Sequence, residues 1–447
     1  MKFLFRRWGG TIVLLAIWTA VLVPAVSIAE SAGNLDLVRT VMQLVEKQYI
    51  VPVTSDQLVS GALKGMLANL DPHSSYMDEN EFQQLTNDTR GQFGGIGIQI
   101  APRNGAPTII APIDGTPAAH AGVEPGDVIT KIDGLSTGGM DFEDIVGHIR
   151  GVVGSTVKLQ IARQGQAPFD VVLTRAVIHV DSVTSHLEKN HVGYIRISTF
   201  MEKTPDDLAT ALKQLKRRAG GRLAGLVLDL RNDPGGLLDS AVSVTGDFLD
   251  GGVVVSTRGR ETKDDHSYDA PGNGDLIPGT PMVVLINGAS ASASEIVAGA
   301  LQDHHRAVIM GTRSFGKGSV QTIIPLDGHG ALRLTTARYY TPSGRSIQDL
   351  GVSPDVVASL PKDEQVANVL LTHEADLPGS LRNTGTENQA QQGTAPTGGT
   401  PSAAAAPADE APIKPAIIGT DRDAQLSAAL KYVQGMSSTA RAAASPR

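Results

Sequence analysis

Apolar residues between positions 34 and 71 recur every three or four residues, in two runs that Pro52 separates. This spacing predicts two amphipathic helices. We assign residues 30–87 to an N-terminal helical region. Residues 88–178 are instead rich in glycine and in short β-branched runs, a pattern typical of a small β-domain.

Residues 179–360 alternate strand patterns with helix patterns. Three nearly all-apolar runs predict strands that are buried on both faces: Leu223–Leu230, Pro281–Ile286 and Arg306–Met310. Helical periodicity covers Leu237–Leu249 and Ser292–Leu301, between these runs. Such units predict an α/β core with parallel strands and right-handed crossovers. We therefore expect the turns 231–236 and 287–291 to lie together at the carboxyl edge of the sheet, where ligands bind.

The two ends of the chain have a different character. Basic residues precede the uncharged run Trp8–Ala29, which ends in small residues, so residues 1–29 have the layout of a secretory signal. The alternative is an uncleaved membrane anchor, since about 20 apolar residues span a bilayer. Both interpretations predict an exported protein, located in the bacterial periplasm and, if the segment is retained, anchored in the inner membrane.

Residues 361–383 are predicted to extend the core. Residues 384–417 are rich in Ala, Pro, Gly, Thr and Gln and almost free of large apolar groups, which predicts a disordered linker. In the remaining tail, 418–447, apolar spacing predicts a short amphipathic helix over 421–435.

Composition narrows the classes of function. The 447 residues include 38 Lys and Arg against 46 Asp and Glu, for a net charge of −8, which argues against a nucleic-acid partner. The absence of cysteine excludes disulfides, thiolate nucleophiles and Cys-ligated metals. We predict no metal site and no cofactor.

Three serines, at 290, 292 and 294, alternate with alanine at the end of the turn 287–291 and just after it. Ser292 and Glu295 fit the S-x-x-E capping box, which marks a helix start. A helix-capping role for Ser292 is compatible with a catalytic role, because a serine at a helix N-terminus faces amides that stabilise an anion. A serine hydroxyl is a weak nucleophile without a base.

Lys317 is the favoured base. Period-two alternation places Lys317, Ser319 and Gln321 on one strand face, where Gln321 would orient the amine. The pKa of this lysine must then fall from ~10.4 to about 7–8, which burial can achieve. The alternative is a surface lysine beside a glycine hairpin.

Two other interpretations are weaker. His304 and His305 follow the same predicted helix as the serines, but no familiar triad motif surrounds them. Gly311–Lys317 matches the start of a phosphate-binding loop, G-x-x-x-x-G-K, yet Gly318 replaces the Ser or Thr that binds magnesium and a strand pattern follows.

The β-domain contains a second glycine-rich site, Phe93-Gly94-Gly95-Ile96-Gly97-Ile98. Successive free amides in such a loop can bind a carboxylate. The local alternative is a plain turn. With Pro117–Gly134, this segment resembles a PDZ domain of the kind found in exported proteases.

Four further motifs resemble the carboxyl-terminal processing (tail-specific) proteases: Asp229–Leu238, Ser290–Asp303, Phe315–Gln321 and Tyr340–Gln348. The resemblance runs from residue 35 to about 358. It implies a crotonase/ClpP-like α/β protease core with a mainly-β PDZ domain and N-terminal helices. It also implies a Ser/Lys dyad, with Ser292 as nucleophile, Lys317 as base and Gln321 as the orienting partner.

The same resemblance implies an oxyanion hole built from the backbone amides of Gly235 or Gly236 and Ala293. Asp233 departs from the asparagine common in this turn. The expected function is an exported serine endopeptidase that cleaves proteins near their C-termini, with residues 93–98 holding the free apolar C-terminus. A homodimer through the N-terminal helices and an activating adaptor protein are family-level expectations. The alternative is a catalytically silent PDZ receptor for protein C-termini.

Overall fold

The computed structural model describes residues 34–103, 106–113, 115–272, 274–366, 372–383 and 412–444. The segment predicted to be a signal or an anchor lies outside the described residues. Within the described ranges, no helix is long and apolar enough to cross a membrane. The chain divides into two units, 1–62 and 63–447.

Helices α1 (Asn34–Gln48) and α2 (Ser55–Ala68) follow the two predicted runs on either side of Pro52. Several large apolar side chains of α1 are exposed, among them Leu35, Val38 and Val41. Apolar spacing therefore gave the helices correctly, although it did not show what covers their apolar faces.

The glycine-rich region is the predicted small β-domain. Its sheet has the strand order β3-β4-β5-β7-β8, with β6 on β5, and the strands β2 and β9 form a separate pair. The strands are β2 (Gln92–Gly95), β3 (Ile98–Arg103), β4 (Ala106–Pro112), β5 (Val128–Ile132), β6 (Leu135–Ser136), β7 (Thr156–Ala162), β8 (Phe169–Thr174) and β9 (Ala176–His179). Helices α4 (Pro117–His120) and α5 (Phe142–Ile149) complete one apolar core with the larger sheet.

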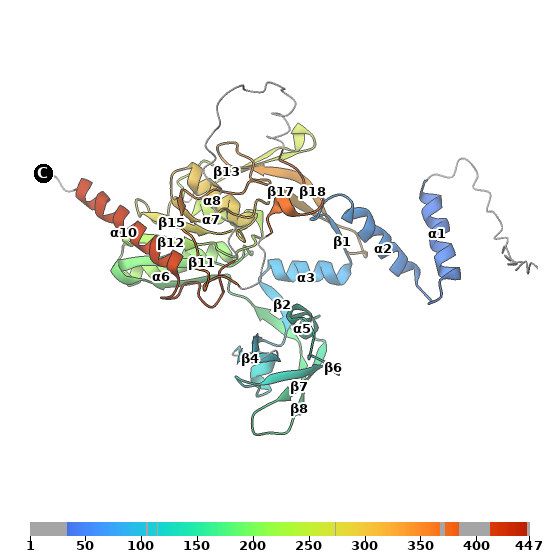
Figure 1. The fold of residues 1–447 in the computed structure, drawn as a ribbon. Helices are drawn as coiled ribbons and strands as arrows, with labels where there is room; N and C mark the ends of the chain where they lie inside the picture. The colour runs from blue at the N-terminus through green and yellow to red at the C-terminus, as the bar shows by residue number, and fades with distance from the viewer. Residues whose placement is uncertain are drawn as a thin grey trace, which may run out of the picture. The chain divides into compact units, whose positions relative to one another are not determined.

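A six-stranded sheet forms the α/β core (Figure 1). Its order is β10 (Val183–Leu187), β11 (Val192–Ile197), β12 (Gly225–Asp229), β15 (Met282–Ile286), β16 (Val308–Gly311) and β19 (Val356–Val357). The strands from β11 to β19 are parallel, and β10 is antiparallel. The three apolar runs of the sequence are β12, β15 and β16, so the predicted parallel arrangement is correct.

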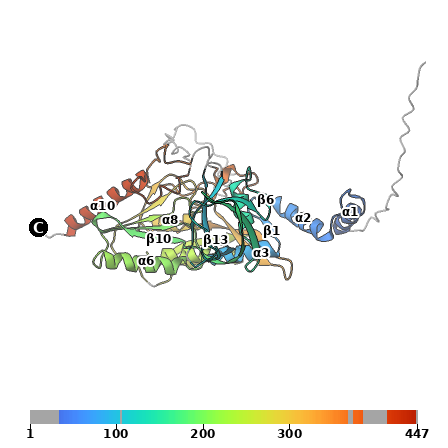
Figure 2. The ribbon, with the colours of Figure 1, turned by 90° about the horizontal axis from the view of Figure 1, so that it is seen from below.

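Side chains alternate along these strands and pack against helices on both faces of the sheet. Leu226 and Leu228 of β12 pack with helices α6 (Thr204–Arg218), α7 (Leu238–Gly246) and α8 (Ala293–Asp303). Val227 points to the opposite face, where it packs against α10 (Ala424–Ala444). Figure 2 shows strands of the sheet between α6 and α10. The central strands are consequently buried on both faces, as the apolar runs predict.

A second, antiparallel sheet lies in the same unit. It contains β1 (Ser75–Met77), β18 (Ala331–Tyr340), β13 (Val253–Gly259) and β14 (His266–Asp269), and β17 (Ser319–Pro325) pairs with β18. Helix α3 (Glu79–Thr89) follows β1, and single 3-10 turns occupy Lys189–His191, Thr262–Asp264 and Glu374–Asp376. Gln321 lies on β17 and Tyr339 lies on β18.

The structure corrects the end of the predicted linker. Residues 412–417 are ordered: Ile413 is fully buried with Leu360 and Ile417, and it forms a bridge with Gln365. Two isoleucines are too few to register as a pattern in a polar stretch, but together with Leu360 they form a small apolar cluster. The tail contains a helix with Leu426, Ala429 and Val433 buried, but it begins at Ala424 and continues to Ala444, beyond the predicted range 421–435.

Candidate active site

Ser292 occupies a strained turn between β15 and α8. Its φ of 56° and ψ of −112° lie in a region that non-glycine residues rarely adopt, and such strain concentrates at functional sites. The residue is the N-cap of α8, and its backbone N–H donates to the Glu295 carboxylate at 2.8 Å. The Ser292 hydroxyl lies 3.0 Å from the Tyr339 hydroxyl.

The neighbouring serines have structural partners. Ser290 Oγ donates to the carbonyl of Leu230 at 2.7 Å, and Ser294 Oγ donates to the carbonyl of Asp233 at 3.0 Å. Both side chains are fully buried and tie the serine turn to the turn after β12. Of the three serines, Ser292 is the one whose hydroxyl contacts another reactive side chain instead of a backbone carbonyl.

The turn after β12 lies against the serine turn, as the sheet topology predicts. The Ala291 N–H donates to the Asp233 carbonyl at 2.9 Å. Gly235 and Gly236 have φ of 100° and 147°, and a Cβ on Gly235 would lie 2.9 Å from the nitrogen of Ala293. Only glycine satisfies both the backbone angles and this close approach.

The amides of this region are not equivalent. The Gly235 N–H donates to Asp233 Oδ1 at 2.8 Å. In the described part of the chain, the N–H groups of Gly236 and Ala293 have no hydrogen-bond acceptor. Gly236 is exposed, whereas Gly235 is buried. The geometry thus narrows the expected oxyanion donors from three residues to Gly236 and Ala293.

Lys317 lies just before β17 and is only partly exposed. Burial lowers the pKa of its ammonium, and the negative charge of Glu374 opposes this effect. This direction is the one that a general base requires. No hydrogen bond in the described residues joins Lys317 Nζ to Ser292 or to Gln321. The Gln321 amide instead donates to Ser319 Oγ at 3.0 Å and to Thr335 Oγ1 at 3.3 Å.

Glu295 connects the serine turn to the lysine loop, a role that the sequence did not reveal. One carboxylate oxygen accepts the N–H of Ser292 and, at 2.9 Å, that of Lys317. The other accepts the Gly316 N–H and the Ser314 hydroxyl. Burial raises the pKa of Glu295 to about 7, although these hydrogen bonds act in the opposite direction and lower it. The S-x-x-E spacing of Ser292 and Glu295 was visible in the sequence as a capping box. The contact between Glu295 and Lys317 joins residues 22 positions apart, and no local pattern indicates it.

Tyr339 was also missed, because a tyrosine in a strand carries no local mark of function. Burial raises the pKa of its hydroxyl to about 12. The phenol therefore stays protonated near neutral pH and can donate to or accept from Ser292 Oγ.

The competing interpretations do not fit this geometry. His304 and His305 follow the far end of α8, about 16 Å from its start at 1.5 Å per residue. His304 Nε2 lies 2.7 Å from the carbonyl of Val253. The segment after Lys317 is a strand, so the phosphate-loop interpretation lacks its helix.

In the β-domain, Phe93–Gly95 form the end of β2 and Ile98 begins β3, so Ile96 and Gly97 alone join the two strands. The carbonyls of Ile96 and Gly97 accept hydrogen bonds from the N–H groups of Ala118 and Ile113. Within the described ranges, the N–H groups of Ile96 and Gly97 have no acceptor. Gly97 has φ of 75°, and a Cβ there would lie 2.3 Å from Thr116. The loop therefore presents two adjacent donors, the arrangement that a carboxylate needs.

The fold and site define a serine peptidase core combined with a PDZ domain, and comparisons with known proteins agree. Residues 191–358 match peptidase family S41, residues 108–163 match the PDZ domain, and residues 23–81 match the activating protease CtpB N-terminal domain. A carboxy-terminal-processing protease from Bartonella bacilliformis is 48% identical over 345 residues, which cover 76% of this chain and 79% of that protein. The chain belongs to the carboxy-terminal-processing proteases of family S41, as the motifs predict.

Two further proteins are similar to this chain at lower identity. The carboxy-terminal processing protease CtpA of Bacillus subtilis is 34% identical over 330 residues, which cover 74% of this chain and 70% of that protein. The solved structure of a photosystem II D1 C-terminal processing protease is 30% identical, with a TM-score of 0.43, and the alignment covers 73% of this chain and 94% of that one.

Proposed function

We propose that this protease uses a Ser292/Lys317 dyad to cleave exported proteins near their C-termini. The observation that carries the proposal is the double use of one Glu295 oxygen, which accepts the N–H groups of both Ser292 and Lys317. This carboxylate fixes the backbone of the nucleophile relative to that of the base, as nucleophilic catalysis requires.

The chemistry is acyl transfer. Neutral Lys317 accepts the proton of Ser292 Oγ as this oxygen bonds to the scissile carbonyl carbon. The N–H groups of Gly236 and Ala293 hold the oxyanion, and one such donor lowers the barrier by about 2.7–4 kcal/mol. The ammonium of Lys317 then protonates the leaving amine as the C–N bond breaks, and water hydrolyses the acyl-enzyme.

The Tyr339 contact suggests a resting arrangement. Because Ser292 Oγ is paired with the Tyr339 hydroxyl, Lys317 must replace this tyrosine as the partner of Ser292 before reaction. Gln321 is then the residue that orients the amine. A bound substrate or an activating adaptor protein would then regulate activity by promoting this exchange of hydrogen-bond partners.

The substrate is a protein with a free apolar C-terminus. The amides of Ile96 and Gly97 bind its carboxylate, and its last residues add to the β-domain as a strand. The free tail then either delivers the substrate or switches the protease on. We also propose a secretory signal or anchor in residues 1–29, a periplasmic location, and a homodimer formed through exposed apolar residues of α1.

The test uses an unstructured protein that ends in apolar residues. Cleavage by the purified full chain, and its loss in both Ser292→Ala and Lys317→Ala, is the expected result. Ser267→Ala, at an exposed position in β14, is the matched control and should retain wild-type activity. Wild-type activity in Lys317→Ala would refute the dyad. Tail binding without cleavage by any variant, even with an adaptor added, would favour a receptor.

A further inference from the structure

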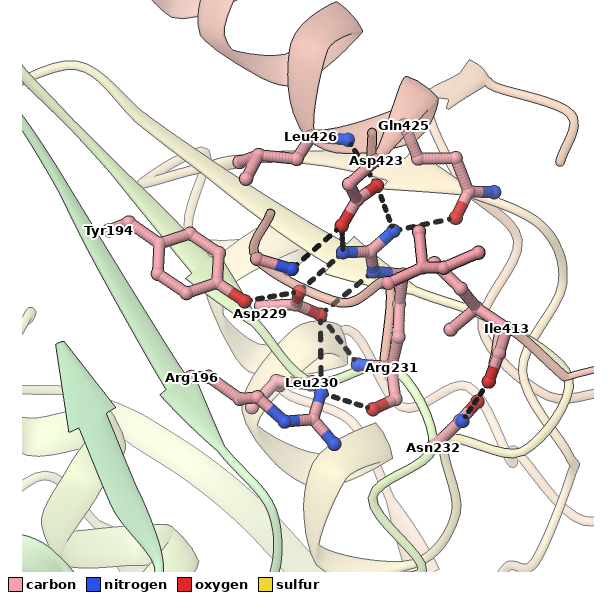
Figure 3. Close-up of polar contacts among 12 residues, drawn as sticks. Tyr194, Arg196, Asp229, Leu230, Arg231, Asn232, Ile413, Asp423, Gln425 and Leu426 are labelled. Carbon is pink, nitrogen blue, oxygen red and sulfur yellow. Dashed lines mark hydrogen bonds and ion pairs between the residues drawn. The ribbon is translucent and has the colours of Figure 1, made fainter. Parts of the chain in front are cut away.

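Arg231 is a fully buried arginine two residues before Asp233, the residue whose carboxyl accepts the Gly235 N–H. Figure 3 shows its guanidinium surrounded by oxygen atoms. All five N–H groups are used: Nε and Nη2 on Asp229 at 2.9 and 2.5 Å, Nη1 and Nη2 on Asp423 at 2.9 and 2.6 Å, and Nη1 on Gln425 at 3.0 Å. An arginine with every donor satisfied has one orientation.

Two of these partners come from the far end of the chain. Asp423 is 192 residues after Arg231, and its carboxylate also accepts the Leu426 N–H at 2.9 Å, in the first turn of α10. The same side chain therefore caps α10 and binds Arg231. Asp229 and Asp423 are both fully buried, so removal of Asp423 leaves guanidinium donors without acceptors inside the protein.

A second contact lies one residue further along. Asn232 Nδ2 donates to the carbonyl of Ile413 at 2.7 Å, and the Asn232 N–H donates to Asn287 Oδ1 at 3.0 Å. The Asn287 amide in turn donates to Asn232 Oδ1 at 2.7 Å. The C-terminal segment thus holds both residues before Asp233, and these residues contact the loop that leads to the serines.

The rest of the segment is anchored on the sheet. Leu426, Ala429 and Val433 are buried against Tyr194 and Val227 on the face opposite α8. The Tyr194 hydroxyl donates to Asp229 Oδ2 at 2.9 Å, so the apolar layer and the arginine network share a residue. A rigid, satisfied network at this position fixes the backbone that enters the turn 231–236.

We propose that residues 412–444 form a C-terminal clamp, in which Asp423 is a positioning residue that aligns the turn 231–236 for catalysis. The inference rests on the proposed role of this turn as the source of an oxyanion donor. A displacement of about 1 Å at a catalytic group costs ~10²-fold in rate. Loosening the clamp should therefore lower kcat and leave substrate binding at the β-domain intact.

The test compares Asp423→Asn with Asp421→Asn in the full chain. Both make the same chemical change two residues apart, but Asp421 is exposed. For Asp423→Asn we expect kcat to fall about 10–100-fold with KM within about twofold of wild type. Amide hydrogen exchange over residues 230–237, measured in a Ser292→Ala background, should accelerate. Asp421→Asn should change neither quantity.

A folded Asp423→Asn with the kcat of its control, or with unchanged exchange over 230–237, would overturn the clamp. If Asp423→Asn does not fold, Gln425→Leu removes the hydrogen bond from Arg231 Nη1 and the bond that Gln425 donates to the Ala358 carbonyl, but it leaves both carboxylates paired with Arg231, and the same two measurements decide. Activity in Ser292→Ala would instead refute the proposed nucleophile. The exchange measurement does not depend on catalysis, so the two failures are distinguishable.

Discussion

Asp233→Asn tests whether a carboxyl group in the active-site turn is neutral at physiological pH. Asp233 is fully buried. Its Oδ1 accepts the Gly235 N–H at 2.8 Å, and its Oδ2 has no partner among the described residues. Burial raises the pKa of Asp233 to about 8. Asparagine keeps the acceptor for Gly235 and cannot ionise.

The size of the effect follows from proton linkage. An unfolded aspartate has a pKa of ~3.9, so between pH ~4 and ~8 the folded protein keeps a proton that the unfolded chain releases. The stability contributed by this group is fully present below pH ~4 and is lost as the pH rises through 8. The slope is ~1.36 kcal/mol per pH unit, or about 4 kcal/mol between pH 4 and 7. Asparagine adds a constant cost of about 1–3 kcal/mol for an unpaired buried amide.

The assay is urea unfolding at pH 5, 7 and 8, followed by circular dichroism because both tryptophans precede residue 34. A Ser292→Ala background prevents self-digestion. The free energy of unfolding of Asp233→Asn, relative to its parent, should rise with pH along the slope above. Asp239→Asn, at an exposed position in α7, is the control and should show no such trend. A constant difference between Asp233→Asn and its parent at all three pH values would refute a neutral Asp233.

Two glycine substitutions test the proposed oxyanion hole and the proposed carboxylate-binding loop separately. Gly236→Ala places a Cβ 2.1 Å from the carbonyl oxygen of Phe200, so we expect kcat/KM to fall at least ~100-fold with peptide binding unchanged; a tenfold loss or less would argue against the Gly236 donor. Gly97→Ala places a Cβ 2.3 Å from Thr116. By fluorescence anisotropy, the affinity for a peptide with a free apolar C-terminus should fall about 10–150-fold, since a loop that loses a hydrogen bond to a charged group loses ~1.5–3 kcal/mol, at ~1.36 kcal/mol per tenfold. Gly147→Ala, in open space on α5, is the control, and equal affinities in the two variants would contradict the loop assignment.

Sequence patterns predicted the parts of the fold that depend on near neighbours. Strand β12 and helix α8 were visible as an apolar run and a helical period, because burial on two faces or one face leaves a repeat in the sequence. Adjacent parallel strands then placed the two turns at one edge. The predicted end of the linker, at residue 417, was wrong, because Ile413 is buried against Leu360, which lies far from it in the sequence.

Contacts across the chain explain what the sequence did not show. Glu295 reaches Lys317, and Ser292 reaches Tyr339, only because β17 and β18 lie beside the start of α8. Strand alternation suggested that Gln321 faces Lys317. In the structure β17 begins at Ser319, and its register shifts between Val320 and Gln321. Such irregularities have no signature in a single sequence.

The position of Asp423 also affects when the protease becomes complete during its synthesis. Domains generally fold in order as a chain is synthesised, and in cell-free synthesis without a translocation system this chain folds as it leaves the ribosome. The PDZ domain, the serines and Lys317 emerge well before residue 423, so Arg231 has Asp229 but not its second carboxylate during this interval. We expect a nascent chain to have substrate-binding ability before it has full peptidase activity. Pulse-labelled chains arrested before and after residue 423 would reveal this delay as a difference in cleavage.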